Sequence, residues 1–436
     1  MREKLWTKNF TIVTLGSFVS MIGHCCVNYA LSFLAYDRTE SAFLYSLMLL
    51  MGILPQMFVP VFAGAFLDRH SRAKTIYTID FIYTCLFAVI ALLLFFDLYI
   101  YWLFLIITFI FGSLNAFYGV AYDSLFPNVI TASNYRKAYA FGSLLYPVAN
   151  TLMAPVSAIV YKSVGLVPLF AGSVILFLVT AIWETHIDAP EPHLTEIARK
   201  KANGEHIATL PPLRQFSTDL KFGIKYIIHE KGLMIITAYF FFTTLAGAVL
   251  STSYLPFFKK EYADGLNLFA IFGISGDFIM DASLIYSVVM GFNTVGRLLG
   301  GIFHYNYKIP TKYKFVVALS VYITLGVLNS FELFSPLIVI IIVQILSGAL
   351  AVNSYNIRIS ATQNYIPDSV RGRFNATFAL ITNSGNVIGL LVAGMLDELY
   401  YIPYIVLGAQ IINMLAILLI MYAGRKYVKP IYNCEL

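Results

Sequence analysis

Long apolar stretches recur along the whole chain and are separated by short polar turns. A helix that crosses a membrane needs about 20 mostly apolar residues, and twelve stretches meet this criterion. Because they extend along the full length, they do not represent one signal peptide on a soluble domain. The pattern predicts twelve membrane-spanning helices, near 9–35, 42–67, 74–96, 101–126, 138–161, 165–186, 232–258, 282–304, 314–331, 335–357, 374–396 and 402–423.

One long polar segment, residues 187–231, interrupts this pattern. It opens with Asp188-Ala-Pro-Glu-Pro192, a run that ends the preceding helix. Apolar residues near its end recur at helical spacing: Phe216, Leu220, Ile224, Ile227 and Ile228. This spacing predicts either an amphipathic helix on the membrane face or an ordinary linker helix.

The linker divides the chain into an N-terminal six-helix bundle, residues 1–186, and a C-terminal six-helix bundle, residues 232–436. The halves also match in sequence, because residues 128–137 follow the fourth span as residues 364–373 follow the tenth. Two similar halves joined by a linker are what a carrier requires if both tilt about a central site.

Composition and charge agree with a membrane protein. The chain is 59% apolar and only 12% charged, which a soluble globular protein of this length does not need. If the N-terminus is cytoplasmic, all but four of the 29 Lys and Arg fall on the cytoplasmic side; the exceptions are Arg38, Lys162, Lys259 and Lys260. The positive-inside rule therefore predicts both termini and residues 187–231 in the cytoplasm. The net charge of +6 follows from the same rule and gives no indication of nucleic-acid binding.

A charged turn joins the second and third spans, with the sequence Gly64-Ala-Phe-Leu-Asp68-Arg69-His-Ser-Arg72-Ala-Lys74. Gly64 allows one helix to pack close to another. The carboxylate of Asp68 can pair with the surrounding cations or cap a helix N-terminus. We expect Gly64, Asp68, Arg69, Arg72 and Lys74 to act as a conformational switch, in which Asp68 is the only anion.

Together with Ser20-x-Ile22-Gly23, Thr39-Glu-Ser-Ala42 and Leu54-Pro55, this turn resembles the major facilitator superfamily. Within that superfamily the likeness is to the bacterial macrolide and enterobactin efflux permeases, and it is sharpest over residues 10–80. The resemblance implies an all-α membrane protein with twelve transmembrane helices in two pseudo-symmetric bundles, the major facilitator fold. The chain departs from the family pattern at Ser71, where Gly is frequent.

Three ionisable residues are candidates for proton coupling. His24 lies about fifteen residues into the first span, roughly 22 Å along a helix that rises ~1.5 Å per residue. An imidazole exchanges a proton near neutral pH, but a neutral histidine hydrogen-bonded to a neighbouring helix is the simpler explanation of its presence. Asp80, two turns into the third span, is expected to pair with the cations of the Gly64–Lys74 turn. Asp80 and Asp123 are the next candidates for coupling.

Polar groups in hydrocarbon are costly, so those inside the spans should face a central cavity. A cavity lined by aromatic rings and a few amides would accept bulky amphipathic compounds, and the chain holds 36 Phe and 30 Tyr. The candidates for its lining are His24, Asn28, Gln56, Asn115, Tyr118, Asn150, Tyr239, Asn293, Asn353, Tyr355, Asn383 and Asn386.

Two opposite charges occupy nearly equivalent positions in the two halves. Asp123 lies near the cytoplasmic end of the fourth span, and Arg358 lies near that of the tenth. The resemblance implies that these spans face each other across the cavity, so the pair is a candidate cytoplasmic gate. Pairing of each residue within its own half is the alternative.

We therefore expect a proton-driven exporter of a bulky amphipathic drug or secondary metabolite, acting as a monomer in a prokaryotic inner membrane. Its partners would be the lipid bilayer, the substrate and the proton. Small residues and prolines of the fifth span, Gly142, Pro147, Ala154-Pro155 and Ser157, resemble the antiporter signature and favour export.

The sequence indicates no enzyme, cofactor or metal site. The four cysteines lack metal-binding spacing, and there is no Walker-type, His-Glu-x-x-His or Gly-x-Ser-x-Gly motif. One alternative is an uptake symporter for a sugar, peptide or siderophore, but polar solutes need several charged groups at mid-membrane, where we expect only His24. A non-transporting sensor that keeps the carrier fold is the other alternative.

Overall fold

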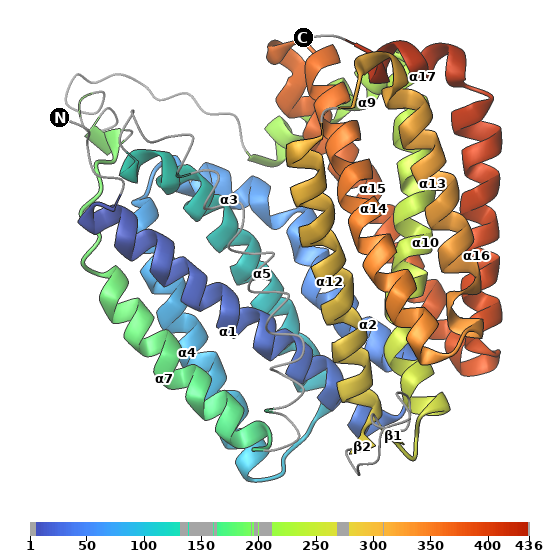
Figure 1. Ribbon diagram of the computed structural model, residues 1–436. Coiled ribbons are helices and arrows are strands. Elements are labelled where there is room, and N and C mark those ends of the chain that lie inside the picture. Colours follow the sequence, from blue (N-terminus) through green and yellow to red (C-terminus); the bar gives the residue numbers. More distant parts are fainter. Residues whose placement is uncertain are drawn as a thin grey trace. The chain divides into compact units, whose positions relative to one another are not determined.

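The computed structural model describes residues 6–130, 138, 160, 164–192, 194–195, 199, 212–267, 279–307 and 309–434, apart from some side chains that include those of residues 24–29. Almost all regular structure in these ranges is helical (Figure 1). The exception is a two-residue antiparallel ladder between β1 (Leu266–Asn267) and β2 (Ile279–Met280), in which Leu266 pairs with Met280.

The described part of the N-terminal half contributes four long helices and several short ones. They are α1 (Lys8–Thr39), α2 (Ala42–Ile53), η1 (Leu54–Met57), α3 (Val59–Leu67), α4 (Arg72–Phe95), α5 (Tyr101–Leu125), η2 (Phe126–Val129) and α7 (Leu166–Glu184). The fifth predicted span, 138–161, lies outside the described residues except for Ala138 and Val160.

The C-terminal half begins with α9, the helix of the linker, and continues through six long helices. They are α9 (Pro212–His229), α10 (Lys231–Glu261), α12 (Ala282–Asn306), η4 (Thr311–Tyr313), α13 (Lys314–Phe331), η5 (Glu332–Phe334), α14 (Leu337–Tyr365), α15 (Asp368–Leu399), α16 (Ile402–Ala416), η6 (Ile417–Tyr422) and α17 (Arg425–Tyr432). Helix α9 packs on α15, where Asp219 forms an ion pair with Arg373 at 2.9 Å.

Within the described residues, nine helices are long and apolar enough to cross a membrane, or ten if one bent pair is a single span. The bent pair corresponds to the predicted second span, 42–67, which we expected to be continuous. It bends by 41° between Ala42–Met57 and Val59–Leu67. Pro55 and Pro60 lie on either side of the break, and proline removes a backbone donor and interrupts an α-helix.

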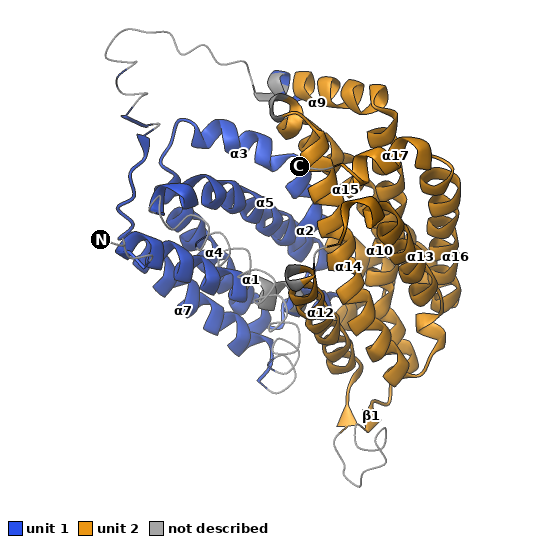
Figure 2. Cartoon of the chain, turned by 45° about the horizontal axis from the view of Figure 1, so that its top comes forward, with its two compact units in different colours: residues 1–35, 51–216 blue, residues 36–50, 217–436 orange. Residues whose placement is uncertain are grey.

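The described contacts divide the chain into two compact units (Figure 2). One contains residues 1–35 and 51–216, and the other contains residues 36–50 and 217–436. The end of α1 and the start of α2 thus belong to the second unit. Their polar contacts there include a 2.7 Å ion pair between Asp37 and Lys259, and a 3.1 Å bond from the Phe43 N–H to Glu398.

Small residues allow α12 and α14 to pack backbone to backbone. A Cβ atom added to Gly300 of α12 would lie 2.5 Å from the Ala349 carbonyl oxygen of α14 and 2.6 Å from its Cα. The next residue, Gly301, faces open space, since an added Cβ there meets no atom within 4 Å. Such small-residue seams bring helices close where no hydrophobic effect from water assists packing.

These neighbouring glycines give a matched test of the seam. Gly300→Val should destabilise the protein by roughly 1–3 kcal/mol, because the added atoms meet backbone that cannot move aside. Gly301→Val makes the same change in helix propensity, and it should lower the stability of the protein far less than Gly300→Val does. Thermal unfolding followed by size-exclusion chromatography measures both variants, and equal losses of stability would contradict the close contact.

Candidate functional site

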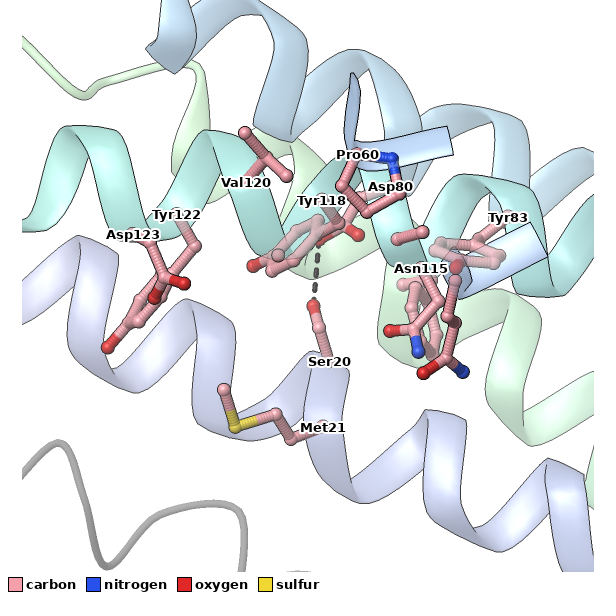
Figure 3. A pocket seen from close by; sticks show the side chains of 14 residues that line it. Ser20, Met21, Pro60, Asp80, Tyr83, Asn115, Tyr118, Val120, Tyr122 and Asp123 are labelled. Atoms are coloured by element: carbon pink, nitrogen blue, oxygen red, sulfur yellow. Dashed lines mark hydrogen bonds between the residues drawn. The ribbon is translucent and has the colours of Figure 1, made fainter. Parts of the chain in front are cut away.

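The first unit contains a cavity of about 640 Å³ that is lined by four helices and the break in the second span. Figure 3 shows the side chains that surround it. The lining residues are Ser20 and Met21 of α1, Gln56 and Pro60 at the break, Asp80 and Tyr83 of α4, Asn115, Ala116, Tyr118, Gly119, Val120, Tyr122 and Asp123 of α5, and Phe177 of α7.

Packed aromatic rings hold these helices together beside the cavity. The ring of Tyr83 stacks on that of Phe111 with 5.2 Å between the ring centroids. The ring of Phe87 meets that of Phe177 edge to face, with 4.9 Å between the centroids. Gly23 of α1 lies directly against the ring of Phe177, because a Cβ added there would overlap it. Ring pairs of this kind contribute about 0.5–1.5 kcal/mol each beyond area burial, so they fix the positions of α1, α4, α5 and α7 around the cavity.

Asp80 is the charged group at the centre of this arrangement. Its side chain is fully buried, and its Oδ2 accepts a hydrogen bond from the Ser20 hydroxyl at 2.8 Å, drawn dashed in Figure 3. The expectation that Asp80 pairs with the cations of the Gly64–Lys74 turn is wrong. The carboxyl group instead points into the bundle, toward α1 and α7.

Glu184, the last residue of α7, is a second fully buried carboxyl group. It lies next to the carboxyl group of Asp80 and against Gly16 of α1, where an added Cβ would be 2.6 Å from its Oε1. Glu184 was not among the predicted site residues, because an acid that ends an apolar stretch resembles an ordinary boundary residue at the water interface.

The remaining predicted residues of this cavity are less buried. Asp123 and Gln56 are exposed and Asn115 is half-buried, and the Gln56 amide donates to the Gly52 carbonyl at 3.3 Å. Tyr118 is buried and donates to the Ser17 hydroxyl at 2.9 Å. The structure therefore brings Gln56, Asp80, Asn115, Tyr118 and Asp123 to one cavity.

The charged turn between α3 and α4 is built differently from our expectation. Ser71, not Asp68, caps α4, since its hydroxyl accepts from the Lys74 N–H. The carboxylate of Glu191 accepts from the Ser71 hydroxyl at 2.6 Å and from the Arg72 N–H at 2.8 Å. Asp68 is therefore not the only anion at this turn.

Two further features of the turn were not foreseen. Arg72 reaches the Ser124 carbonyl at 2.8 Å, which ties the turn to the end of α5. Gly64 makes no close helix contact among the described residues, since an added Cβ meets nothing within 4 Å. The close approach lies elsewhere on this hairpin, where the carbonyl of Gly52 touches Gly112 of α5.

Predicted cavity residues of the second unit do not share the cavity of the first. Tyr239 is buried, and its ring centroid lies 4.9 Å from that of Tyr322. The side-chain oxygen of Asn353 accepts a hydrogen bond from the His304 ring at 3.1 Å. Tyr355 is exposed, and Asn383 and Asn386 are half-buried.

Arg358 belongs to this second unit as well. Its guanidinium group lies over three aromatic rings, those of Phe240, Tyr355 and Phe378, at 4.7–5.2 Å. Cation–π contacts of this kind stabilise a positive charge that has left water.

Asn293 belongs to a buried polar chain in the second unit. The Gln344 amide donates to Glu332 at 2.7 Å and accepts from Asn293 at 2.7 Å, and Asn293 in turn accepts from Arg297 at 3.0 Å. Glu332 and Asp397 are fully buried carboxyl groups that the sequence analysis missed. Both lie near the ends of their helices, so they do not test the expectation that His24 is the only ionisable residue at mid-membrane.

Three predicted residues cannot be placed. The side chains of His24 and Asn28 and all of Asn150 lie outside the part of the chain that the structure describes. Among the described residues, no group of three or more His, Cys, Asp or Glu side chains is arranged to hold a metal ion.

Residues 13–334 match the family model of the Major Facilitator Superfamily. The chain belongs to this superfamily. Proteins of this superfamily are multi-pass membrane transporters and not enzymes, and the chain has their architecture, the major facilitator fold. The predictions of family and fold class are thus confirmed.

Characterised and uncharacterised bacterial relatives are similar at low identity. Macrolide efflux protein A of Streptococcus pyogenes is 23% identical over 251 residues, which cover 58% of this chain and 57% of that protein. The uncharacterized MFS-type transporter YkuC of Bacillus subtilis is 23% identical over 298 residues, 67% of this chain and 64% of YkuC. The chain thus spans less than two thirds of the length of these relatives.

Solved structures show the same fold over nearly the whole chain. The structure of the D-xylose-proton symporter matches with a TM-score of 0.67 at 14% sequence identity. The match covers 98% of this chain and 99% of the symporter chain. The nucleoside transporter NupG has a TM-score of 0.66 at 13% identity, covering 96% and 100%. At these identities the likeness defines the fold alone.

The contact between Glu191 and the start of α4 gives a testable prediction. Glu191→Ala removes the acceptor for the Ser71 hydroxyl and the Arg72 N–H, and with it a negative charge at a helix N-terminus. We expect a loss of about 0.5–2 kcal/mol of stability, measured by thermal unfolding. Asp188→Ala is the matched control, because Asp188 contacts Asn9 through its backbone. An equal effect of both variants would contradict the contact.

Proposed function

We propose that this transporter exports a bulky, amphipathic small molecule of the macrolide kind in exchange for protons, by alternating access in a prokaryotic inner membrane. Both termini would lie in the cytoplasm, as the distribution of Lys and Arg favours. The cavity in the first unit is the observation that carries the proposal. Its volume of about 640 Å³ lies within the range of small-molecule sites.

The lining of the cavity supports this class of substrate. Aromatic rings of Tyr83, Tyr118, Tyr122 and Phe177 provide apolar surface, and the amide of Asn115 provides polar contacts. Such a lining binds large amphipathic molecules without strict matching of hydrogen bonds. The similarity to macrolide efflux protein A supports export and the macrolide class.

Residues 36–50 are held within the second unit by polar contacts. The ion pair between Asp37 and Lys259 is only about a quarter exposed, and Glu398 binds both the Ser41 hydroxyl and the Phe43 N–H. By the charge rule these contacts lie on the outer side of the membrane.

Ligand-induced thermal stabilisation tests the substrate class. A ligand at about 100 times its Kd stabilises the protein that it binds by about 2.7 kcal/mol. We expect stabilisation by macrolides and none by sugars, nucleosides or dipeptides in a panel measured on the purified protein. Stabilisation by a polar solute without any response to macrolides would overturn the proposal in favour of an uptake symporter.

Two glycines test whether this cavity is the binding site. Gly119 lines the cavity and Gly172 lies on the exposed face of α7, and an added Cβ meets no atom within 4 Å at either position. Gly119→Leu should fill part of the cavity and weaken macrolide binding by about tenfold or more, the effect of roughly 1.4 kcal/mol. Gly172→Leu should bind as the unchanged protein does, and equal affinities of the two variants would place the site elsewhere.

A cytoplasmic gate between Asp123 and Arg358 remains part of the proposal. Removing one partner should destabilise the closed gate by about 1–3 kcal/mol and lower the transport rate. The double exchange Asp123→Arg with Arg358→Asp should restore transport that each single exchange loses, measured as efflux from cells or proteoliposomes. If the double variant folds but is as inactive as the single ones, the rings around Arg358 are its functional partners and the gate is refuted.

A further inference from the structure

Two fully buried carboxyl groups meet behind the cavity of the first unit. Asp80 is in the third turn of α4 and lines the cavity, whereas Glu184 is the last residue of α7 and is not part of the cavity lining. Asp80 bonds to Ser20 of α1 and Glu184 lies against Gly16, one turn earlier on the same helix, so the two carboxyl groups are neighbours. Two carboxylates cannot bond to each other, because neither has a hydrogen to donate.

The pair has too few donors for two negative charges. The Ser20 hydroxyl donates to Oδ2 of Asp80 at 2.8 Å. Oδ1 of Asp80 and both oxygens of Glu184 accept no hydrogen bond from any described residue. Buried carboxylates require several hydrogen-bond donors or a cation to remain charged. Three of the four carboxyl oxygens have neither, so the surroundings do not stabilise two negative charges.

The neighbouring groups do not supply the missing hydrogen. Tyr118 of α5 lies beside Glu184, but its hydroxyl hydrogen is donated to Ser17. Tyr83 of α4 donates its own to the Phe111 carbonyl at 3.2 Å. From α1 the pair is faced by Gly16 and Ser20. The groups that interact electrostatically with the pair are tyrosines and the two acids themselves, with no cation among those described.

We propose that Asp80 and Glu184 together hold one exchangeable proton and form the proton-carrying site of this transporter. In the loaded state, the O–H of one carboxylic acid donates to the carboxylate of the other. In the unloaded state the O–H bond breaks, the proton passes to a water molecule in the cavity beside Asp80, and both groups are left ionised. The carrier role rests on the proposed exchange of substrate for protons, whereas the shared proton itself does not.

Infrared spectroscopy of the purified protein tests the shared proton without any substrate. We expect the carbonyl band of a buried carboxylic acid near neutral pH, which shifts when Asp and Glu carry carbon-13 in their carboxyl groups. Glu184→Gln and Asp80→Asn should each remove this band, because an amide donates to the remaining carboxylate in place of the proton. Asp123→Asn is the matched control from the same cavity, and it should leave the band in place.

Several results would overturn the inference. One is an unchanged carboxylic-acid band in both Glu184→Gln and Asp80→Asn. Another is a band that disappears when sodium replaces potassium at constant pH, because the pair would then be a sodium site. If neither variant folds, titration of the labelled unchanged protein decides, since a band that shows no response to pH contradicts an exchangeable proton.

Transport by Glu184→Gln tests the carrier role. In proteoliposomes we expect this variant to keep downhill exchange of macrolide and to lose accumulation driven by a pH gradient. Accumulation equal to that of the unchanged protein would overturn the role. If the unchanged protein moves no macrolide at all, the proposed substrate is wrong, and the infrared result still decides whether the pair holds a proton.

Discussion

The cost of a charge inside an apolar helical bundle is the constraint on which this structure depends. Each buried carboxyl group must find donors, a cation or a proton, because ionisation in a medium of low polarity is costly. Glu332 finds the Gln344 amide, and Asp397 accepts from the Ser253 hydroxyl at 3.0 Å. The carboxyl groups of Asp80 and Glu184 lie next to each other and have the Ser20 hydroxyl as their one hydrogen-bond donor among the described residues. This distinguishes the pair from the other buried acids of the described chain.

The position of the pair links this constraint to transport. Asp80 belongs both to the pair and to the wall of the cavity, so a molecule in the cavity and a proton on the pair share one side chain. A substrate that changes the polarity around Asp80 also changes the free energy of holding the proton. By thermodynamic linkage, a proton on the pair must change the affinity for the substrate by the same factor. Exchange of a proton for a substrate needs such a coupling.

The apolar pattern predicted the elements well because each spanning helix must bury its own backbone polar groups in lipid. The predicted span 314–331 coincides with α13, and 101–126 exceeds α5 by one residue. The second span was less predictable. Its apolar pattern continues through Pro55, and only the backbone geometry reveals the break.

The site was harder to predict than the fold. Five predicted residues meet at one cavity, because polar side chains inside spans avoid lipid. Glu184 and Glu191 were missed, since their importance depends on contacts with α4 that no local pattern encodes. Asp80 was given the wrong partners for the same reason: cations nearby in sequence suggested an ion pair, whereas Glu184 is nearby in space.

Proton release on substrate binding is the most direct test of the link between cavity and carboxyl pair. The measurement is the pH change of a weakly buffered solution of the purified protein on addition of a macrolide, with Glu184→Gln in parallel. The account predicts that the unchanged protein releases a proton for each molecule bound and that Glu184→Gln binds the macrolide without release. Macrolide binding to the unchanged protein without proton release, at any pH between mildly acidic and mildly alkaline, would contradict it.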